Sequence, residues 1–332
     1  MMDVSAGFPP GPETPDHIAL AEALGFRRAW VYDSPALYSD VWVTLGRAAD
    51  RTSRIGLGTG VLIPSLRHVM VTASAIAGLD AIAPGRVAVG VGSGFTGRMT
   101  LGKRPNPWAC VADYIRALRG LLRGDEVEWD GAVIKMIHPA GFVADRPLDV
   151  PILVAGEGPK GLAAARELGD GVFSVTGPKA GFEWCAVLQF GTVLEEGEAF
   201  DSRRVIECAG HAVGAAYHAL LEWSGAEGAA SLPGGDEWRT IIETVPERTR
   251  HLAIHEGHMV AVNDRDRPFV TGNLVAAMTF TGTAKDLADR MVALEQGGAT
   301  ELVVQPGGSD VGRELGKFAD MAGLAGVAGL KS

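Results

Sequence analysis

Several features that mark large protein classes are scarce or missing in this chain. Only three cysteines occur among 332 residues, Cys110, Cys185 and Cys208, and they form no C-x-x-C pair. This sparse, odd count argues against a disulfide framework and favours a reducing compartment. No run approaches the ~18 apolar residues of a membrane span, and the first residues lack the basic-then-apolar order of a signal peptide. We therefore expect a cytoplasmic protein that does not enter the membrane.

Positive charge is also scarce. The chain has 30 Lys and Arg residues against 40 Asp and Glu, a formal net charge of −10, and it contains no Lys/Arg run. Because a nucleic-acid footprint requires a basic patch, nucleic acid is not an expected partner. The acidic balance still permits an anionic small-molecule ligand, since backbone N–H groups can bind phosphate without net positive charge.

The chain is rich in glycine and in short apolar runs that alternate with helical patterns. Its 45 glycines are about 14% of the residues, roughly twice the average. The apolar runs are continuous rather than alternating, which is typical of parallel strands covered by helices. Eight β-then-α units predict a single-domain (β/α)8 barrel over residues 1–325, with an open doubly wound sheet as the alternative. The predicted strands are residues 2–8, 28–33, 55–63, 86–92, 151–156, 171–175, 278–281 and 301–305.

Two segments interrupt the alternation. Residues 125–140 contain Asp130-Gly131 between short alternating runs, which predicts a β-hairpin. Residues 177–277 are too many for a βα loop, and 204–223 has a helical pattern. We interpret this second segment as a helical region inserted between the sixth and seventh predicted strands, near the mouth of the barrel.

One glycine-rich stretch matches two nucleotide-binding patterns incompletely. Residues 92–97 (GSGFTG) fit G-x-G-x-x-G directly after a predicted strand. A dinucleotide fold requires a long helix to open there, and the following sequence does not predict one. Arg98 and Met99 replace the Lys and Ser/Thr of a P-loop, so a nucleotide triphosphatase is not favoured either.

Histidine and serine patterns give weaker indications. His251, His255 and His258 lie at i, i+4 and i+7 and could face one metal ion if the segment were helical. Glu256-Gly257 weakens that helix, so structural or substrate-lining histidines are favoured and no metal is predicted. Ser93 lacks the G-x-S-x-G context of a hydrolase nucleophile.

Small residues dominate the ends of the predicted strands. In a (β/α)8 barrel the chemistry lies at the C-terminal strand ends, and glycine there lets a flat ligand approach the backbone closely. Residues 156–158 (GEG), followed by a predicted helix start at Pro159, also offer N–H groups to a phosphate. Any one of these glycines could serve only a tight turn, but together the strand ends predict a cofactor site.

Several stretches of the sequence resemble a known family. They are residues 57–64 (LGTGVLIP), Arg67-His68, 72–80 (TASAIAGLD), 85–94 and 151–171. Together they resemble the luciferase-like flavin oxidoreductases, nearest to members that use the deazaflavin F420, such as methylenetetrahydromethanopterin reductase. Members that use FMN, including two-component monooxygenases, share the scaffold. The resemblance implies a (β/α)8 barrel that holds a flavin-like ring at its C-terminal face.

The resemblance also implies residues for each part of the site. It places a non-prolyl cis peptide at Gly60-Val61, behind the ring, and Asp33 and His68 as catalytic candidates. The implied cofactor-binding residues are Asp33, Ser34, Gly60, Val61, Ser93, Gly156, Glu157, Gly158, Thr176 and Gly177. The implied substrate pocket contains Trp42, Phe95, His255 and His258.

Two departures from the family bear on the activity. Ser34 stands where members often carry a histidine, and Phe95 stands where the F420-dependent sugar-phosphate dehydrogenase has a catalytic glutamate. Phe95 therefore argues against that substrate and favours a more apolar one. The expected function is hydride transfer between F420 and a small organic substrate. The alternatives are a reduced-FMN monooxygenase served by a flavin reductase, and a non-catalytic flavin-binding barrel. Analogy with the family implies a homodimer.

Overall fold

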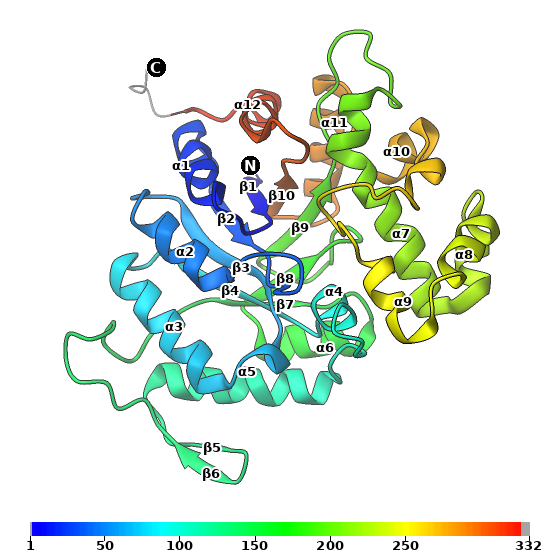
Figure 1. Ribbon diagram of the computed structural model, residues 1–332. Coiled ribbons are helices and arrows are strands. Elements are labelled where there is room, and N and C mark those ends of the chain that lie inside the picture. The colour runs from blue at the N-terminus through cyan, green and yellow to red at the C-terminus, as the bar shows by residue number, and fades with distance from the viewer. Residues whose placement is uncertain (1, 327–332) are drawn as a thin grey trace.

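Parallel strands close into a barrel in the computed structural model, which describes residues 2–326 (Figure 1). Each strand of the closed sheet pairs in parallel with both neighbours, in the order β1-β10-β9-β8-β7-β4-β3-β2. This architecture confirms the predicted (β/α)8 barrel. The strands are β1 (Asp3–Phe8), β2 (Arg28–Val31), β3 (Gly56–Leu62), β4 (Val87–Gly92), β7 (Ile152–Ala155), β8 (Gly171–Ser174), β9 (Cys185–Phe190) and β10 (Glu301–Gln305).

Helices surround the barrel and cover the outer faces of the strands (Figure 1). The first helix shows how sequence sets their limits: Pro15 occupies the first turn, and Gly25 ends the helix in the left-handed conformation at φ 92°. The helices are α1 (Thr14–Leu24), α2 (Val41–Ala49), α3 (Val69–Ile82), α4 (Phe95–Met99), α5 (Trp108–Arg123), α6 (Pro159–Leu168), α7 (Arg203–Ala230), α8 (Gly235–Glu243), α9 (Glu247–Ile254), α10 (Gly272–Met278), α11 (Ala284–Gln296) and α12 (Val311–Ala322).

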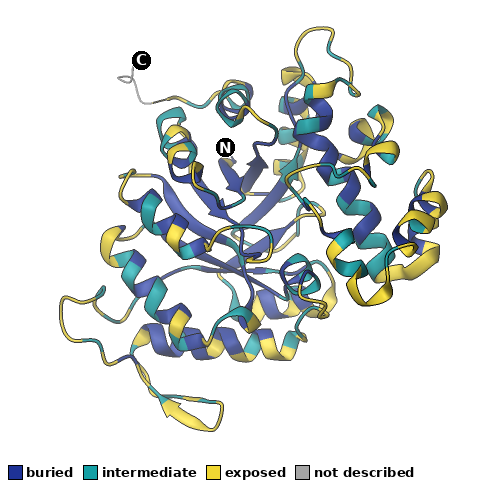
Figure 2. Ribbon diagram, in the orientation of Figure 1, coloured by how far each residue is buried: buried dark blue, intermediate teal, exposed yellow. Residues whose placement is uncertain are grey.

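Glycines in the strands make room for aromatic side chains inside the barrel. The barrel strands are buried along most of their length, whereas the helices are exposed on their outer faces (Figure 2). A Cβ atom on Gly58 would lie 2.6 Å from the ring of Trp30, and one on Gly7 would lie 2.7 Å from the hydroxyl of Tyr32. Part of the high glycine content therefore serves packing in the barrel interior, because only glycine leaves space for these rings.

The predicted seventh strand at residues 278–281 is wrong. The barrel uses β9 instead, a short apolar run inside the region interpreted as an insertion. Residues 278–281 lie beyond the end of β9, where the Phe280 N–H donates to the Phe190 carbonyl at 2.7 Å and a single bridge joins Val193 to Gly282. The helical insertion therefore follows the seventh barrel strand in chain order rather than the sixth. Both segments are short enough to be strands, and only pairing with β8 and β10 shows that residues 185–190 form the seventh barrel strand.

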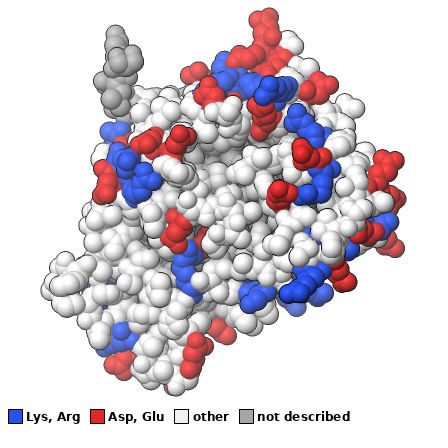
Figure 3. All heavy atoms as spheres, in the orientation of Figure 1, with Lys and Arg blue, Asp and Glu red and all other residues white. Residues whose placement is uncertain are grey.

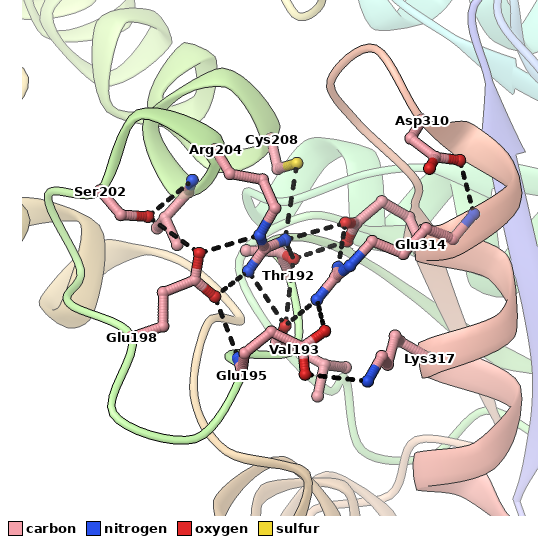
Figure 4. A network of polar contacts seen from close by, with 12 residues as sticks. Thr192, Val193, Glu195, Glu198, Ser202, Arg204, Cys208, Asp310, Glu314 and Lys317 are labelled. Atoms are coloured by element: carbon pink, nitrogen blue, oxygen red, sulfur yellow. Dashed lines mark hydrogen bonds and ion pairs between the residues drawn. The ribbon is translucent and has the colours of Figure 1, made fainter.

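The helices that follow β9 build a second hydrophobic cluster beside the barrel. Val213, Tyr217 and Trp238 are among its buried members. A polar network ties this region to α12: Glu314, 1% exposed, accepts from Arg204 at 3.0 Å and from Thr192 at 2.6 Å (Figure 4). The network fixes the start of α7 against the barrel wall.

The predicted hairpin is present as β5 (Val127–Trp129) and β6 (Ala132–Ile134). Asp130 and Gly131 have φ angles of 50° and 79°, as a tight two-residue turn requires. Among the described residues, none of the helices combines the length and apolar character needed to cross a bilayer.

Candidate active site at the C-terminal ends of the strands

The peptide bond between Gly60 and Val61 is cis, as the family resemblance implied. It lies near the end of β3, where the pairing register with β4 shifts between Thr59 and Leu62. The Val61 side chain projects over β4, because a Cβ atom on Gly90 or Gly92 would lie 2.7 Å from its methyl groups. Both residues of the cis bond are only partly buried, so this backbone forms part of the accessible barrel mouth.

Asp33 follows β2 and forms an ion pair with Arg67, which was not among the predicted site residues. Its Oδ2 accepts from Arg67 Nη1 at 2.6 Å, and Arg67 Nη2 donates to Asp40 at 2.7 Å. Burial raises the pKa of Asp33, and the Arg67 guanidinium only partly opposes this effect. The carboxylate is therefore held in place by Arg67. The sequence contained one sign of a role for Arg67, because the Arg67-His68 pair is among the stretches that resemble the family.

Ser93 and Phe95 lie where β4 passes into α4. This five-residue helix opens at a place where no long helix was expected, and it ends at Met99. A Cβ atom on Gly97 would lie 3.0 Å from the Asp33 carbonyl oxygen and 3.3 Å from Ser34 Oγ. Helix α4, which follows Ser93 and β4, thus packs against Asp33 and Ser34 at the end of β2.

Glu157 joins the ends of β7 and β8. Its carboxylate accepts from Ser174 Oγ, from the Val175 N–H at 2.6 Å and from Thr176 Oγ1, and it pairs with Lys179 at 2.8 Å. Burial alone would raise its pKa, but Lys179 and the hydrogen bonds outweigh burial and lower the pKa of Glu157. The side chain is therefore an anionic brace between two strand ends.

The N-terminus of α6 is open. Gly158 is its N-cap residue, and no side chain caps the helix. A Cβ atom on Gly158 would meet nothing within 4 Å, and the same is true of Gly177 on the neighbouring strand end. The first N–H groups of α6 and the space beside them match what a phosphate group requires.

His68 and Trp42 have structural contacts of their own. His68 Nδ1 accepts the Met70 N–H at 3.1 Å as the N-cap of α3, and its exposed ring contacts Trp129 of the hairpin. Trp42 lies in the first turn of α2 and packs against the main core. Its indole N–H is buried without a hydrogen-bond partner. None of these contacts links His68 or Trp42 to Asp33 or Glu157. The catalytic role of His68 and the substrate-binding role of Trp42 therefore stay predictions.

His255 and His258 lie in a buried histidine cluster. His258 belongs to the segment after α9. The third histidine of the cluster is His218 of α7 rather than His251, whose ring faces Gly102. Burial, with smaller contributions from His218 and His251, lowers the pKa of His255 to about 3. Burial also lowers the pKa of His258, so the imidazoles of His255 and His258 are neutral at physiological pH.

Phe95 connects this cluster with the barrel mouth. Its ring centroid lies 4.8 Å from that of Trp223 and 6.2 Å from that of His255. Trp223 is 64% exposed, and no sequence pattern marks it for the site because it falls inside a long helical segment. The face that carries α4 is mainly uncharged at its centre, with most of its charged side chains toward the edge (Figure 3). The arrangement offers an apolar contact surface beside polar backbone, which suits a flat conjugated ligand and an apolar substrate.

Most of the chain matches a known protein family. The model of the family described as luciferase-like monooxygenase matches residues 2–301. A 5,10-methylenetetrahydromethanopterin reductase from Methanolobus tindarius is 38% identical over 157 residues, 46% of this chain and 47% of that protein. One with the same name from Archaeoglobus fulgidus is 26% identical over 322 residues, 92% of each chain. The chain thus matches about half the length of the first curated relatives, and nearly all of a more distant one.

The fold is shared with solved structures. The coenzyme F420 dependent tetrahydromethanopterin reductase of Methanopyrus kandleri superposes with a TM-score of 0.69 at 20% sequence identity. The superposition covers 98% of this chain and 99% of that one. At this identity, the likeness establishes the barrel architecture alone.

Proposed function

The chain belongs to the luciferase-like monooxygenase family, and from that premise we propose that it is an F420-dependent oxidoreductase. It transfers a hydride between the deazaflavin and a small organic substrate at the C-terminal face of the barrel. The names of its relatives, which include methylenetetrahydromethanopterin reductases and F420-dependent glucose-6-phosphate dehydrogenases, support this cofactor. Phe95 and Trp223 favour a less polar substrate than a sugar phosphate.

The observation that carries the proposal is the open N-terminus of α6 beside the accessible cis peptide. Gly158 leaves the cofactor phosphate access to the first N–H groups of the helix, and Gly156, Glu157, Thr176 and Gly177 surround the same strand ends. An anion is stabilised there by the unpaired N–H groups and by the helix dipole. Glu157 would repel a phosphate if it were free, but Lys179 neutralises it.

The ring would rest on the part of the mouth formed by the ends of β2, β3 and β4. The backbone of Gly60 and Val61 supports one face, with Asp33, Ser34 and Ser93 beside its polar edge. When bound, F420 supplies the hydride-carrying carbon of the reaction. The chain orients the reactants and excludes water with Phe95 and Trp223. Asp33 serves as an anchor rather than a mobile proton donor, because Arg67 already holds its carboxylate.

A fluorescence-quench titration of the purified protein with F420, and separately with FMN, tests this proposal. We expect saturable micromolar binding of F420 and much weaker binding of FMN. Turnover of reducible ketones, enones and imines with reduced F420 would then separate an enzyme from a non-catalytic flavin-binding barrel. Failure to bind either cofactor would reject the site placement.

A second candidate is a reduced-FMN monooxygenase, favoured by the description of the family model. Selective FMN binding with oxygen uptake in the presence of a flavin reductase would establish it. In either case we propose a cytoplasmic homodimer acting on a small molecule. Sedimentation of the purified chain and fractionation of producing cells test these two points.

A further inference from the structure

Three imidazoles from distant parts of the chain converge beside the barrel mouth. His218 comes from α7, and His255 and His258 come from the end of α9 and the turn after it. Their side chains are 2%, 1% and 3% exposed. One ring nitrogen from each lies within 4.8 Å of the others, and His218 Nδ1 is 2.9 Å from His258 Nδ1.

The cluster contains polar atoms that the protein itself does not satisfy. Both ring nitrogens of His255 are buried and have no hydrogen-bond partner. Leaving a buried polar group unpaired costs ~1–3 kcal/mol, so a partner of another kind is indicated. The Glu222 carboxylate is near the cluster, with its Oε1 4.0 Å from His255 Nε2.

The surroundings of His218 match the outer shell of a metal site. Its Nε2 faces Asp266 Oδ2 at 2.9 Å, which leaves Nδ1 pointing toward the other two histidines. Asp266 is held in turn by the Trp238 indole N–H at 2.8 Å and by Asn263 Nδ2 at 2.9 Å. A carboxylate that fixes the far nitrogen of a ligating histidine is the usual support of a zinc-bound imidazole.

We propose that His218, His255 and His258 bind a divalent transition-metal ion of the zinc class, with Asp266 as the supporting carboxylate. Glu222 is a candidate for a fourth ligand. Zinc–imidazole bonds are about 2.0–2.1 Å long, which puts the nitrogens of a tetrahedral site about 3.3 Å apart. The observed nitrogens are 2.9 Å apart for His218 and His258 and within 4.8 Å across the cluster, so modest side-chain shifts complete the site. The ion would join α7 to the segment after α9 and fix both against Phe95. The proposal is independent of the cofactor assignment.

A histidine–histidine hydrogen bond is the competing explanation. It accounts for His218 and His258, with Asp266 accepting from His218 and one Nδ1–H donating to the other ring. It leaves His255 with two unpaired buried nitrogens in contact with both rings, at centroid distances of 6.0 and 4.9 Å. A metal ion would bind one nitrogen of each ring and so give His255 the partner that the hydrogen bond between the other two rings does not supply, which is why we favour it.

Tag-free full-length protein, dialysed against a chelator, tests the site by calorimetric titration with Zn²⁺ and by absorption spectroscopy with Co²⁺. We expect about one ion per chain, visible d–d bands of a four-coordinate Co²⁺ site, and a rise in Tm on Zn²⁺ addition. His255→Ala and His258→Ala should abolish saturable binding. Asp266→Asn should weaken it roughly 10–100-fold.

His251→Ala is the matched control, because His251 precedes the cluster on α9 but faces Gly102. It should bind metal like the unsubstituted chain. Absence of saturable Zn²⁺ binding and of d–d bands in the unsubstituted protein would overturn the proposal, whatever the stability of the variants. Equal binding by His255→Ala and His251→Ala would also overturn it, since the metal would then lie elsewhere.

Discussion

Gly156 and Gly161 pack backbone against backbone, so that a Cβ atom on Gly156 would lie 2.5 Å from the carbonyl carbon of Gly161. This contact seats the first turn of α6 against the end of β7. The two glycines of residues 156–158 therefore have different roles. Gly156 positions the helix, whereas Gly158 keeps the helix N-terminus open.

Gly158→Asp tests the phosphate site without harming the fold. An aspartate is a good N-cap, and the φ of −92° and ψ of 173° at this position suit it. We expect unchanged or slightly higher thermal stability of the free protein, and a cofactor Kd at least ~10-fold higher, about 1.4 kcal/mol. The added carboxylate occupies the N–H groups and repels the phosphate. Gly158→Ser is the neutral control. An unaltered Kd in Gly158→Asp would move the phosphate away from α6.

Gly156→Ala should act on stability whether or not cofactor is present. The added methyl group overlaps the Gly161 backbone, which cannot move without shifting α6. Overpacking of this kind costs ~1–3 kcal/mol, measurable by urea unfolding. Gly46→Ala is a suitable comparison, because a Cβ atom there meets nothing within 4 Å. Equal stability of the two variants would contradict the close contact.

Arg67→Met should destabilise the protein because it leaves Asp33 as an unpaired buried carboxylate. Breaking such a pair typically costs ~3–5 kcal/mol. The folded-state pKa of Asp33 already lies above its usual value, and loss of Arg67 raises it further. Stability linked to protonated Asp33 is fully present below about pH 3.8 and is lost as pH rises through the folded pKa.

The defect of Arg67→Met should therefore be largest near neutral pH and shrink on acidification. Urea unfolding at several pH values measures this trend. Adding Asp33→Asn to Arg67→Met should recover much of the lost free energy of unfolding. A double variant as unstable as the single one would show that Arg67 acts mainly through Asp40.

Glu198 should give the protein an acid-sensitive contribution to stability. Its pKa is lowered to about 2, chiefly by the hydrogen bond from Arg204, in the network of Figure 4. Because the folded pKa is depressed, the contribution is present above about pH 4.5 and is lost as pH falls toward 2. Glu198→Gln should lose at most roughly 3 kcal/mol near neutral pH and little near pH 2. The exposed neighbour Glu196, changed to Gln, should behave like the unsubstituted chain throughout.

Trp223→Ala tests the apolar side of the proposed substrate site. The ring is 64% exposed and contacts Phe95, so its loss should leave Tm nearly unchanged. KM for an apolar acceptor found in the turnover screen should rise roughly 10-fold, as expected when substrate loses a large apolar contact. Leu252→Ala removes a 54% exposed side chain from α9 and is the control. An equal KM for the two variants would place the substrate elsewhere.

The sequence by itself determined the features that depend on local pattern. Continuous apolar runs predicted seven of the eight barrel strands, and Asp130-Gly131 predicted the hairpin, because neighbouring residues alone set these preferences. The stretch around Gly60 placed the chain in its family and located the cis peptide. Small residues at the strand ends predicted a cofactor site at the C-terminal face of the barrel.

Tertiary structure decided everything that joins distant segments. Strand β9, and not residues 278–281, pairs with β8 and β10 in the barrel. Amino-acid composition does not reveal this pairing. Helix α9 ends at Ile254, so helical spacing no longer applies to His258, and His218, forty positions earlier in the chain, completes the cluster in place of His251. The partners of Asp33 and Gly156 were likewise set by packing. Periodicity reports which face of an element is buried, but only the assembled barrel fixes what that face meets.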